Sequence, residues 1–225
     1  MFAGIRLPLI ILFGFLIINT ARGDISEQQK LVDQAFHTLD GFLKEDKQTE
    51  LPIYLQNAYA VLILPDVLRG GFIIGAEHGY GVLLARNVHT GVWTQPAFIE
   101  IYGGSFGLQI GGQTSEMVFT IMNQSAIEKL LSSRFKIGAD ASVAFGRLGA
   151  GVGAGTTVQL GEDIYAFARN RGLFGGVALD GSVVVPLDDW NTAFYGTSVT
   201  TTAILAAQVP QNSGTDPLRQ LLTRY

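Results

Sequence analysis

A serine between glycines matches a motif of covalent catalysis. Residues Gly103 to Gly107 read GGSFG, which fits the G-x-S-x-G pattern of the nucleophile elbow. That elbow needs a strand before the serine, a helix after it and a histidine later in the chain. Here a strand-like run follows Ser105, and the three histidines all precede it (His37, His78 and His89). We therefore predict a turn between strands at this motif, no catalytic residue, and a protein that is not an enzyme.

A second glycine-rich stretch, residues 146–157, reads GRLGAGVGAGTT and raises the question of a phosphate-binding loop. Such a loop follows a buried strand, opens a helix and offers a lysine at a set position. No lysine follows these glycines, and the next residues are β-like. The glycines recur at every second position, so in a strand they share one face. We predict an extended segment whose bare face admits a strand, a helix or an acyl chain, with a surface loop as the alternative.

Metal and thiol chemistry have little support. The chain contains no cysteine, and its histidines are too scattered to form a helical metal-binding pair. Asp188 and Asp189 are expected to cap a short helix, and Glu77 and His78 to stand at a polar hairpin tip. We therefore expect no metal site and no cofactor.

Basic residues gather in one part of the sequence. Six lie between positions 129 and 171: Lys129, Arg134, Lys136, Arg147, Arg169 and Arg171. If the fold brings these residues together, they form a local patch able to hold phosphate headgroups. The alternative is an ordinary solvated surface.

The composition is that of a folded domain. Hydrophobic residues make up 48% of the 225 residues and charged residues 15%, which is ample apolar material for one core. The formal net charge is −4, which argues against general nucleic-acid binding. Any anionic ligand therefore needs a local basic surface.

The first residues have the pattern of a secretory signal peptide. Arg6 precedes an apolar run from Leu7 to Ile18, and small residues at Ala21 and Gly23 fit a cleavage site. We predict a signal peptide at 1–23 and an exported protein, periplasmic or secreted; an uncleaved anchor is the alternative. With no cysteine, lipoprotein attachment is excluded. The mature chain then has 13 basic and 19 acidic residues, a net charge of −6.

The spacing of apolar residues predicts the helices and strands that carry these residues. Apolar residues at helical spacing predict an amphipathic helix over 27–46, and Pro52 starts a shorter one. Short apolar runs separated by turns then predict antiparallel strands, the first stopped by Pro65, with helical turns at 125–131 and 189–194. We expect one α+β domain over 24–207, with an antiparallel sheet that curls toward a barrel, followed at 208–225 by a linker and a short C-terminal helix.

Long stretches of the chain resemble the SYLF domain, also called the Ysc84-type actin-binding or lipid-binding domain. They include AYAVLILPDVLRGGFIIGAEHGYGVLLAR, VWTQPAFIEIYGGSFGLQIGGQTSEMVFTIMN, FKIGADASVAFG, IYAFARNRGLFGGVALDGSVV and NTAFYG. Together they cover most of residues 58–196, and the chain looks like an exported, bacterial-type member. The GGSFG match lies inside a family stretch that is not catalytic.

The resemblance implies a non-enzymatic domain that associates with anionic phospholipid or phosphoinositide-like headgroups at a membrane surface. Where many eukaryotic members carry serine-lysine-glycine, this chain has Asn170-Arg171-Gly172, which keeps the positive charge. Some members bind actin, but an exported protein would not meet cytosolic actin. The alternative is a structural or interaction module of the cell envelope that binds a protein or glycan partner.

Overall fold

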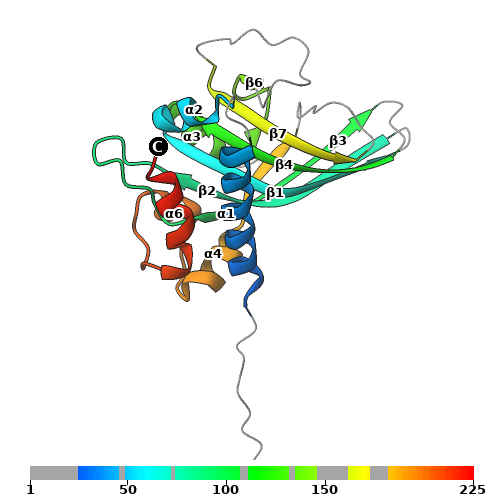
Figure 1. The fold of residues 1–225 in the computed structure, drawn as a ribbon. Helices are drawn as coiled ribbons and strands as arrows, with labels where there is room; N and C mark the ends of the chain where they lie inside the picture. The colour runs from blue at the N-terminus through cyan, green and yellow to red at the C-terminus, as the bar shows by residue number, and fades with distance from the viewer. Residues whose placement is uncertain are drawn as a thin grey trace, which may run out of the picture.

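The computed structural model describes residues 25–45, 49–71, 74–106, 111–131, 135–145, 162–172 and 182–225. Two helices come first, strands and one helix follow, and a helical segment ends the chain (Figure 1). The elements are α1 (Glu27–Glu45), α2 (Leu51–Asn57), β1 (Ala60–Gly71), β2 (Ile74–Ala85), β3 (Ala97–Phe106), β4 (Gly111–Ile121), α3 (Gln124–Leu131), β5 (Phe135–Lys136), β6 (Val143–Phe145), β7 (Ile164–Gly172), β8 (Val183–Pro186), α4 (Asp188–Tyr195), α5 (Thr201–Leu205), the 3₁₀ turn η1 (Ser213–Thr215) and α6 (Asp216–Leu222).

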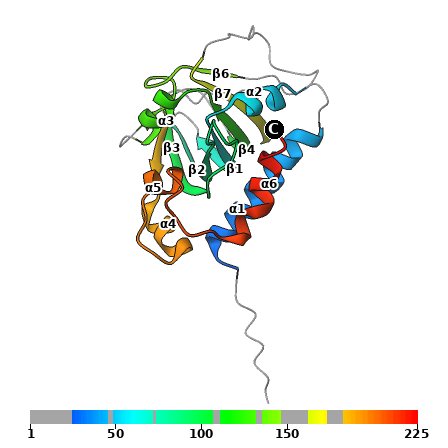
Figure 2. The same cartoon turned by 90° about the vertical axis from the view of Figure 1, so that its left-hand side faces the viewer.

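The strands form one eight-stranded sheet in the order β5-β8-β3-β2-β1-β4-β7-β6. All neighbours pair antiparallel except β6 and β7, which run parallel. The two edge strands, β5 and β6, are joined by residues 137–142 alone, so the sheet must curl to bring its edges near each other (Figure 2). The predicted α+β class and curled antiparallel sheet are confirmed. The parallel pair was not predicted, because periodicity does not report strand direction.

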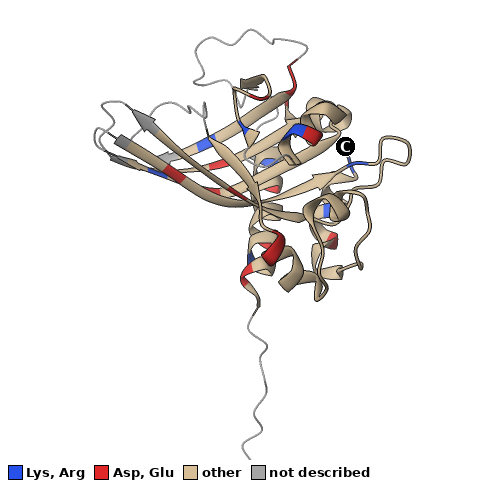
Figure 3. Ribbon diagram, turned by 180° about the vertical axis from the view of Figure 1, so that it is seen from behind, with Lys and Arg blue, Asp and Glu red and all other residues tan. Residues whose placement is uncertain are grey.

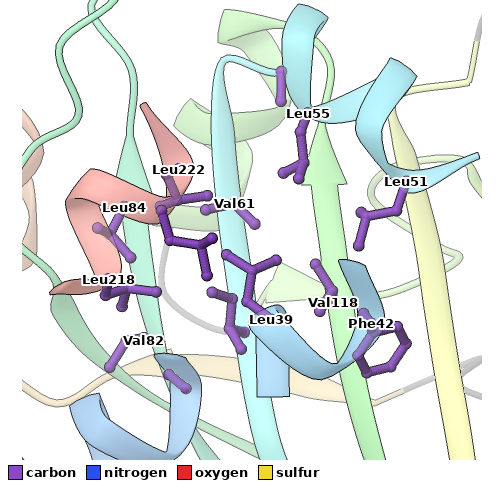
Figure 4. Packing of buried hydrophobic residues seen from close by; sticks show 14 of the residues in the cluster. Leu39, Phe42, Leu51, Leu55, Val61, Val82, Leu84, Val118, Leu218 and Leu222 are labelled. Atoms are coloured by element: carbon purple, nitrogen blue, oxygen red, sulfur yellow. The ribbon is translucent and has the colours of Figure 1, made fainter. Parts of the chain in front are cut away.

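Each face of the curled sheet carries its own apolar cluster. The outer face packs against α1 and α6, and the inner face encloses α3 together with both edges of the sheet. Helix α1 supplies Leu31, Val32, Ala35, Leu39 and Phe42, all buried. Figure 4 shows Leu39 and Phe42 among the other labelled residues of this cluster. Each such large side chain contributes roughly 1.5–3 kcal/mol when it leaves water. The amphipathic face predicted over 27–46 is therefore occupied by the protein's own sheet.

Strand β1 does not end at Pro65, contrary to the sequence expectation. It continues to Gly71, and its register with both neighbours shifts around this proline. A β-bulge tolerates proline because the ladder is already interrupted there. The bend brings the β1 backbone onto two glycines of β2. A Cβ on Gly79 would lie 2.7 Å from the Asp66 carbonyl oxygen, and one on Gly81 would overlap that of Ile63.

The C-terminal segment packs on the domain. Thr215 is buried and donates a hydrogen bond to Gln95 Oε1 over 2.7 Å, and Gln29 of α1 donates to the Gly214 carbonyl over 2.9 Å. Leu218 and Leu222 of α6 join the outer core beside α1. The predicted helix from Asp216 is present, whereas the stretch 208–217, expected as a linker, is tied by these polar contacts to α1 and to the residues before β3.

Asp188 has a different role from the expected cap. It is the first residue of α4, whose N-cap position is Leu187 without a side-chain hydrogen bond. The Asp188 carboxylate instead accepts hydrogen bonds from the backbone N–H and the hydroxyl of Thr201, at 2.8 and 3.0 Å. It therefore ties α4 to the first turn of α5, a helix that the sequence analysis missed.

The other helix predictions are confirmed to within two residues, namely those over 27–46, 125–131 and 189–194. Two predictions lie outside the described residues: the signal peptide at 1–23 and the extended glycine segment at 146–157.

Candidate binding site

Two of the six predicted headgroup residues lie on neighbouring elements. Lys129 near the end of α3 and Lys136 on β5 are both exposed, and α3 packs against β5. The backbone N–H of Lys136 donates to Asp140 Oδ2 over 2.6 Å, which ties down the strand but leaves the ammonium outside. Two exposed cations on rigid, adjoining elements are suited to a phosphate-bearing surface.

Lys129 also acts on a nearby carboxylate. The hydrogen bond from Asn123 holds the pKa of the Asp163 carboxyl below its ordinary value, although burial acts in the opposite direction. The backbone N–H of Ser142 and the charge of Lys129 lower that pKa further. Asn123 Oδ1 in turn accepts the N–H of Ala126, so this polar junction connects the start of α3 to β7.

Arg169 is engaged within the fold. Its Nε and Nη2 lie 2.6 and 2.5 Å from Glu116 Oε2, directly across the β4–β7 ladder. Its guanidinium carbon lies 4.9 Å from the centre of the Phe42 ring of α1. Only 25% of the Arg169 side chain is exposed, on the outer face of the sheet, whereas α3 with Lys129 packs on the inner face.

Three of the six predicted headgroup residues remain: Arg171, Arg134 and Arg147. Arg171 stands in β7 opposite Thr114, and Arg134 and Arg147 lie outside the described residues. The structure thus brings Lys129 and Lys136 to adjoining elements and places Arg169 across the sheet from them. Headgroup binding by any of the six stays a prediction. Figure 3 shows that the basic residues drawn are spread over several elements.

The GGSFG motif does not form an elbow where the structure describes it. Gly103, Gly104 and Ser105 lie within β3 and pair with β2, so the predicted turn is wrong. Gly103 is required by close packing, because a Cβ there would lie 2.8 Å from Glu77 Oε1 and 3.1 Å from Ser182 Oγ. The glycine therefore makes room for a buried carboxylate.

That carboxylate is the centre of a polar cluster that the sequence analysis missed. Glu77 is 7% exposed and accepts hydrogen bonds from Arg69 of β1, through Nε at 3.1 Å and through Nη2, and from the Ser182 hydroxyl. Glu77 and His78 were expected at a hairpin tip, but both lie inside β2, which begins at Ile74. The glycine pair Gly70-Gly71 was the available signal for the end of β1.

A second buried polar group lies beside this cluster on the inner face. Gln113 of β4 stands opposite Arg69 and donates to Ser115 Oγ over 2.9 Å; Ser115 donates in turn to Asn170 Oδ1 over 2.8 Å. Gln113 Oε1 is buried without a hydrogen-bond partner. Inward-facing positions at this end of the sheet are thus polar, in contrast to the apolar cluster around α3.

The outer face of the same end is exposed. Leu68, His78 and Tyr102 stand side by side across β1, β2 and β3, and the exposed fractions of Leu68 and Tyr102 are 63% and 41%. His78 Nε2 lies 2.7 Å from Glu100 Oε1. This row presents apolar side chains beyond the area that α1 covers.

Two features are absent from the described residues. No group of three or more histidines, aspartates or glutamates is placed to hold a metal ion within the described ranges. No helix in those ranges is both long enough and apolar enough to cross a membrane.

The fold is a domain of α+β class. Its curled, mostly antiparallel sheet carries α1 and α6 on one face and α3 on the other. The model of the family described as "Ysc84: Las17-binding protein actin regulator" matches residues 102–225. The chain belongs to this family, whose domain is the SYLF domain predicted from the sequence.

Curated relatives agree with this assignment. An SH3 domain-containing protein of Schizosaccharomyces pombe is 31% identical, over 76% of this chain and 40% of that protein. Protein YSC84 of Saccharomyces cerevisiae is 29% identical, over 76% and 37% respectively. The human SH3 domain-containing YSC84-like protein 1 is 27% identical, over 73% and 48%. The chain thus spans less than half the length of these relatives.

Proposed function

We propose that this protein is a non-enzymatic lipid-binding domain that associates with anionic phospholipid or phosphoinositide-like headgroups at a membrane surface. The observation that carries the proposal is the pair of exposed ammonium groups on adjoining elements, Lys129 on α3 and Lys136 on β5. Arg134 lies between them in the sequence and adds a third cation to the same eight residues. Because the chain has a net charge of −4, attraction to an anionic surface must come from such local groups.

The test is co-sedimentation of residues 24–225 with liposomes, either neutral or rich in phosphatidylglycerol, at low and high salt. All the contacts described above lie within 25–225, so this protein retains the fold. We expect binding to anionic vesicles only, and loss of binding in high salt because exposed charges are screened. Absence of binding to both kinds of vesicle would refute the proposal.

A variant pair compares the two exposed lysines with an arginine on the other face of the sheet. Lys129→Gln with Lys136→Gln should weaken anionic binding, whereas Arg169→Gln should act mainly on stability because Glu116 and Phe42 already hold that side chain. Unchanged vesicle binding by the double lysine variant would remove these two residues from the site.

The proposal includes export. The pattern of the first 23 residues supports a periplasmic or secreted location. Fractionation of cells that produce the full chain, with mass spectrometry of the N-terminus, would test this; a protein that keeps residues 1–23 in the soluble cytoplasmic fraction would contradict it.

A second candidate function is an interaction module for a protein or glycan partner. Two observations favour it: the exposed row of Leu68, His78 and Tyr102, and the family description, which names Las17 binding and actin regulation. Crosslinking in cells, with F-actin co-sedimentation as a separate arm, would test it. A stable partner whose capture is lost in Leu68→Asp, without vesicle binding by the unmodified protein, would favour this candidate.

A further inference from the structure

The connection between β2 and β3 is a tight hairpin over residues 86–93 that is well fixed to the domain. Arg86 and Trp93 form an antiparallel bridge, and the N–H of Asn87 donates to the Val92 carbonyl over 2.9 Å. At the tip, Asn87 Oδ1 accepts the backbone N–H groups of His89 and Thr90 at 3.0 and 3.1 Å. An asparagine used in this way closes a turn, so the tip has a defined conformation.

The base of the hairpin is anchored on two sides. Trp93 is 1% exposed, and its carbonyl accepts hydrogen bonds from Arg219 of α6 at 3.1 and 3.2 Å. On the other side, Arg86 Nη1 donates to the Gln56 carbonyl at the end of α2 over 2.7 Å. The hairpin, α2 and α6 therefore share one end of the molecule, on the left in Figure 1.

This end exposes apolar side chains. Val88 and Val92 of the hairpin are 52% and 55% exposed, and Ile53 of α2 is 62% exposed. Exposed branched side chains on anchored elements lie ready to be buried against a second surface, and little conformational entropy is lost when that happens.

Two of the segments at this end contain no acidic residue, whereas Glu50 stands at the N-cap of α2 and Asp216 of α6 pairs with Arg219 over 3.2 Å. Residues 51–65 and 78–99 contain neither aspartate nor glutamate, although the chain has 19 acidic residues. Arg86 contributes a positive charge whose hydrogen bonds go to backbone carbonyls, and no ion pair holds it among the described residues. The acids at this end of the sheet, Glu162 and Asp163, precede β7, which is separated from β2 by β1 and β4.

We infer that the hairpin 86–93, together with α2, is the surface through which the domain meets an anionic bilayer. Val88 and Val92 enter the interfacial region and Arg86 faces the phosphates. An acidic protein is repelled less by an anionic surface when it approaches with segments that contain no acid, and apolar side chains next to a cation gain from both parts of the interface. This inference rests on the proposed lipid function and adds an apolar contact to the headgroup contacts proposed for Lys129 and Lys136.

The absence of cysteine permits a direct test. A single His89→Cys substitution, labelled with an environment-sensitive fluorophore such as NBD, reports whether the tip enters a bilayer. Leu68→Cys with the same label is the matched control, because Leu68 is equally exposed on the outer face of the sheet. With phosphatidylglycerol vesicles, we expect a blue shift and brighter emission at position 89, no change at position 68, and no change at either position with neutral vesicles.

Substitutions give a second measurement. Val88→Ser with Val92→Ser should weaken co-sedimentation with phosphatidylglycerol vesicles about tenfold or more, because two exposed valines no longer gain from burial. Leu68→Ser should bind as the unmodified protein does. Thermal melting should be nearly unchanged in both, since all three side chains are exposed.

The outcomes separate the two proposals. If the protein sediments with anionic vesicles while the label at position 89 keeps its aqueous emission, lipid binding stands and this surface is wrong. The same holds if Leu68→Ser releases the protein and the double valine variant does not. If the unmodified protein binds no vesicle, the lipid function itself fails and the inference fails with it.

Discussion

The guanidinium of Arg169 lies over the ring of Phe42, which connects the seventh strand of the sheet to the first helix of the domain. Glu116 fixes the same guanidinium from the neighbouring strand. A cation held between a carboxylate and an aromatic face fastens α1 to β4 and β7, beside the apolar contacts that these elements share. This arrangement explains why Gly41 faces Arg169: a Cβ there would lie 3.0 Å from Nη2.

Replacing Arg169 should therefore reduce stability. We expect Arg169→Ala to lower the free energy of unfolding by about 2 kcal/mol, because Glu116 would be left half-buried without its strongest donor. Urea denaturation followed by circular dichroism measures this. Lys44→Ala is the control: Lys44 is 73% exposed in its pair with Asp40, and its loss should cost less than about 0.5 kcal/mol. Equal effects of the two substitutions would contradict the structural role of Arg169.

Two classes of glycine should respond differently to alanine. Gly79→Ala places a methyl group against the backbone at the β1 bulge, 2.7 Å from the Asp66 carbonyl oxygen, and should cost about 1–3 kcal/mol. Gly104→Ala and Gly112→Ala meet nothing closer than 3.8 and 4.0 Å and should be neutral or slightly stabilising. Thermal melts of the three variants give the ranking. A tolerated alanine at position 79 would show that the bulge can relax.

The junction at Asp163 should make stability sensitive to acid. Its folded pKa is depressed, chiefly by the hydrogen bond from Asn123, so its contribution is fully present above the ordinary value of 3.8 and is lost as the pH falls through the lower folded value. Asp163→Asn should then melt below the unmodified protein at pH 7, and the difference should shrink below about pH 3.8.

The same junction offers a direct spectroscopic check. Asn123→Ala removes the largest cause of the depressed pKa, so the Asp163 carboxyl should titrate at higher pH by carbon-detected NMR. An unchanged titration would mean that Ser142 and Lys129, and not Asn123, hold the carboxylate in its charged form.

Asn191 should be the most sensitive polar residue of the helical C-terminal segment. It is fully buried, accepts the N–H of Phe98 over 2.9 Å and donates to Thr201 Oγ1 over 2.9 Å. Asn191→Ala leaves both groups without their partner and should cost about 2–3 kcal/mol. Asn57→Ala is the control, because Asn57 is exposed and bonds only the Ile53 carbonyl one turn back. Hydrogen exchange at Phe98 would show whether the loss is local.

Much of the architecture was predictable because it depends on local patterns. The spacing of Leu31, Ala35, Leu39 and Phe42 indicates α1 whatever it packs against, and short apolar runs indicate strands. The SYLF family could also be recognised from the sequence, because its motifs are long continuous stretches. The candidate site was only partly predictable, because Lys129 and Arg169, which belong to the same basic part of the sequence, lie on different faces of the sheet.

The sequence analysis missed the buried polar cluster and the exposed hairpin because both depend on how the strands pair. Glu77 and Arg69 face the same side of the sheet only because the register of β1 and β2 places them directly opposite each other, and a shift of one residue would send a side chain to the opposite face. The sequence analysis predicted only turns between the strands. The exposure of Val88 and Val92 and the hydrogen bonds that anchor the hairpin 86–93 cannot be inferred from residue composition.

The sequence by itself determined the class of the domain, its family and the amphipathic character of its first helix, because these follow from residue types and their spacing. Only the tertiary structure decided that the apolar face of α1 is covered by the sheet, that Arg169 is held by Glu116, and that Val88 and Val92 remain exposed beside α2 on segments that contain no acid. Pairing register and the direction of each face are set by contacts between segments far apart in the chain, and no local pattern carries that information.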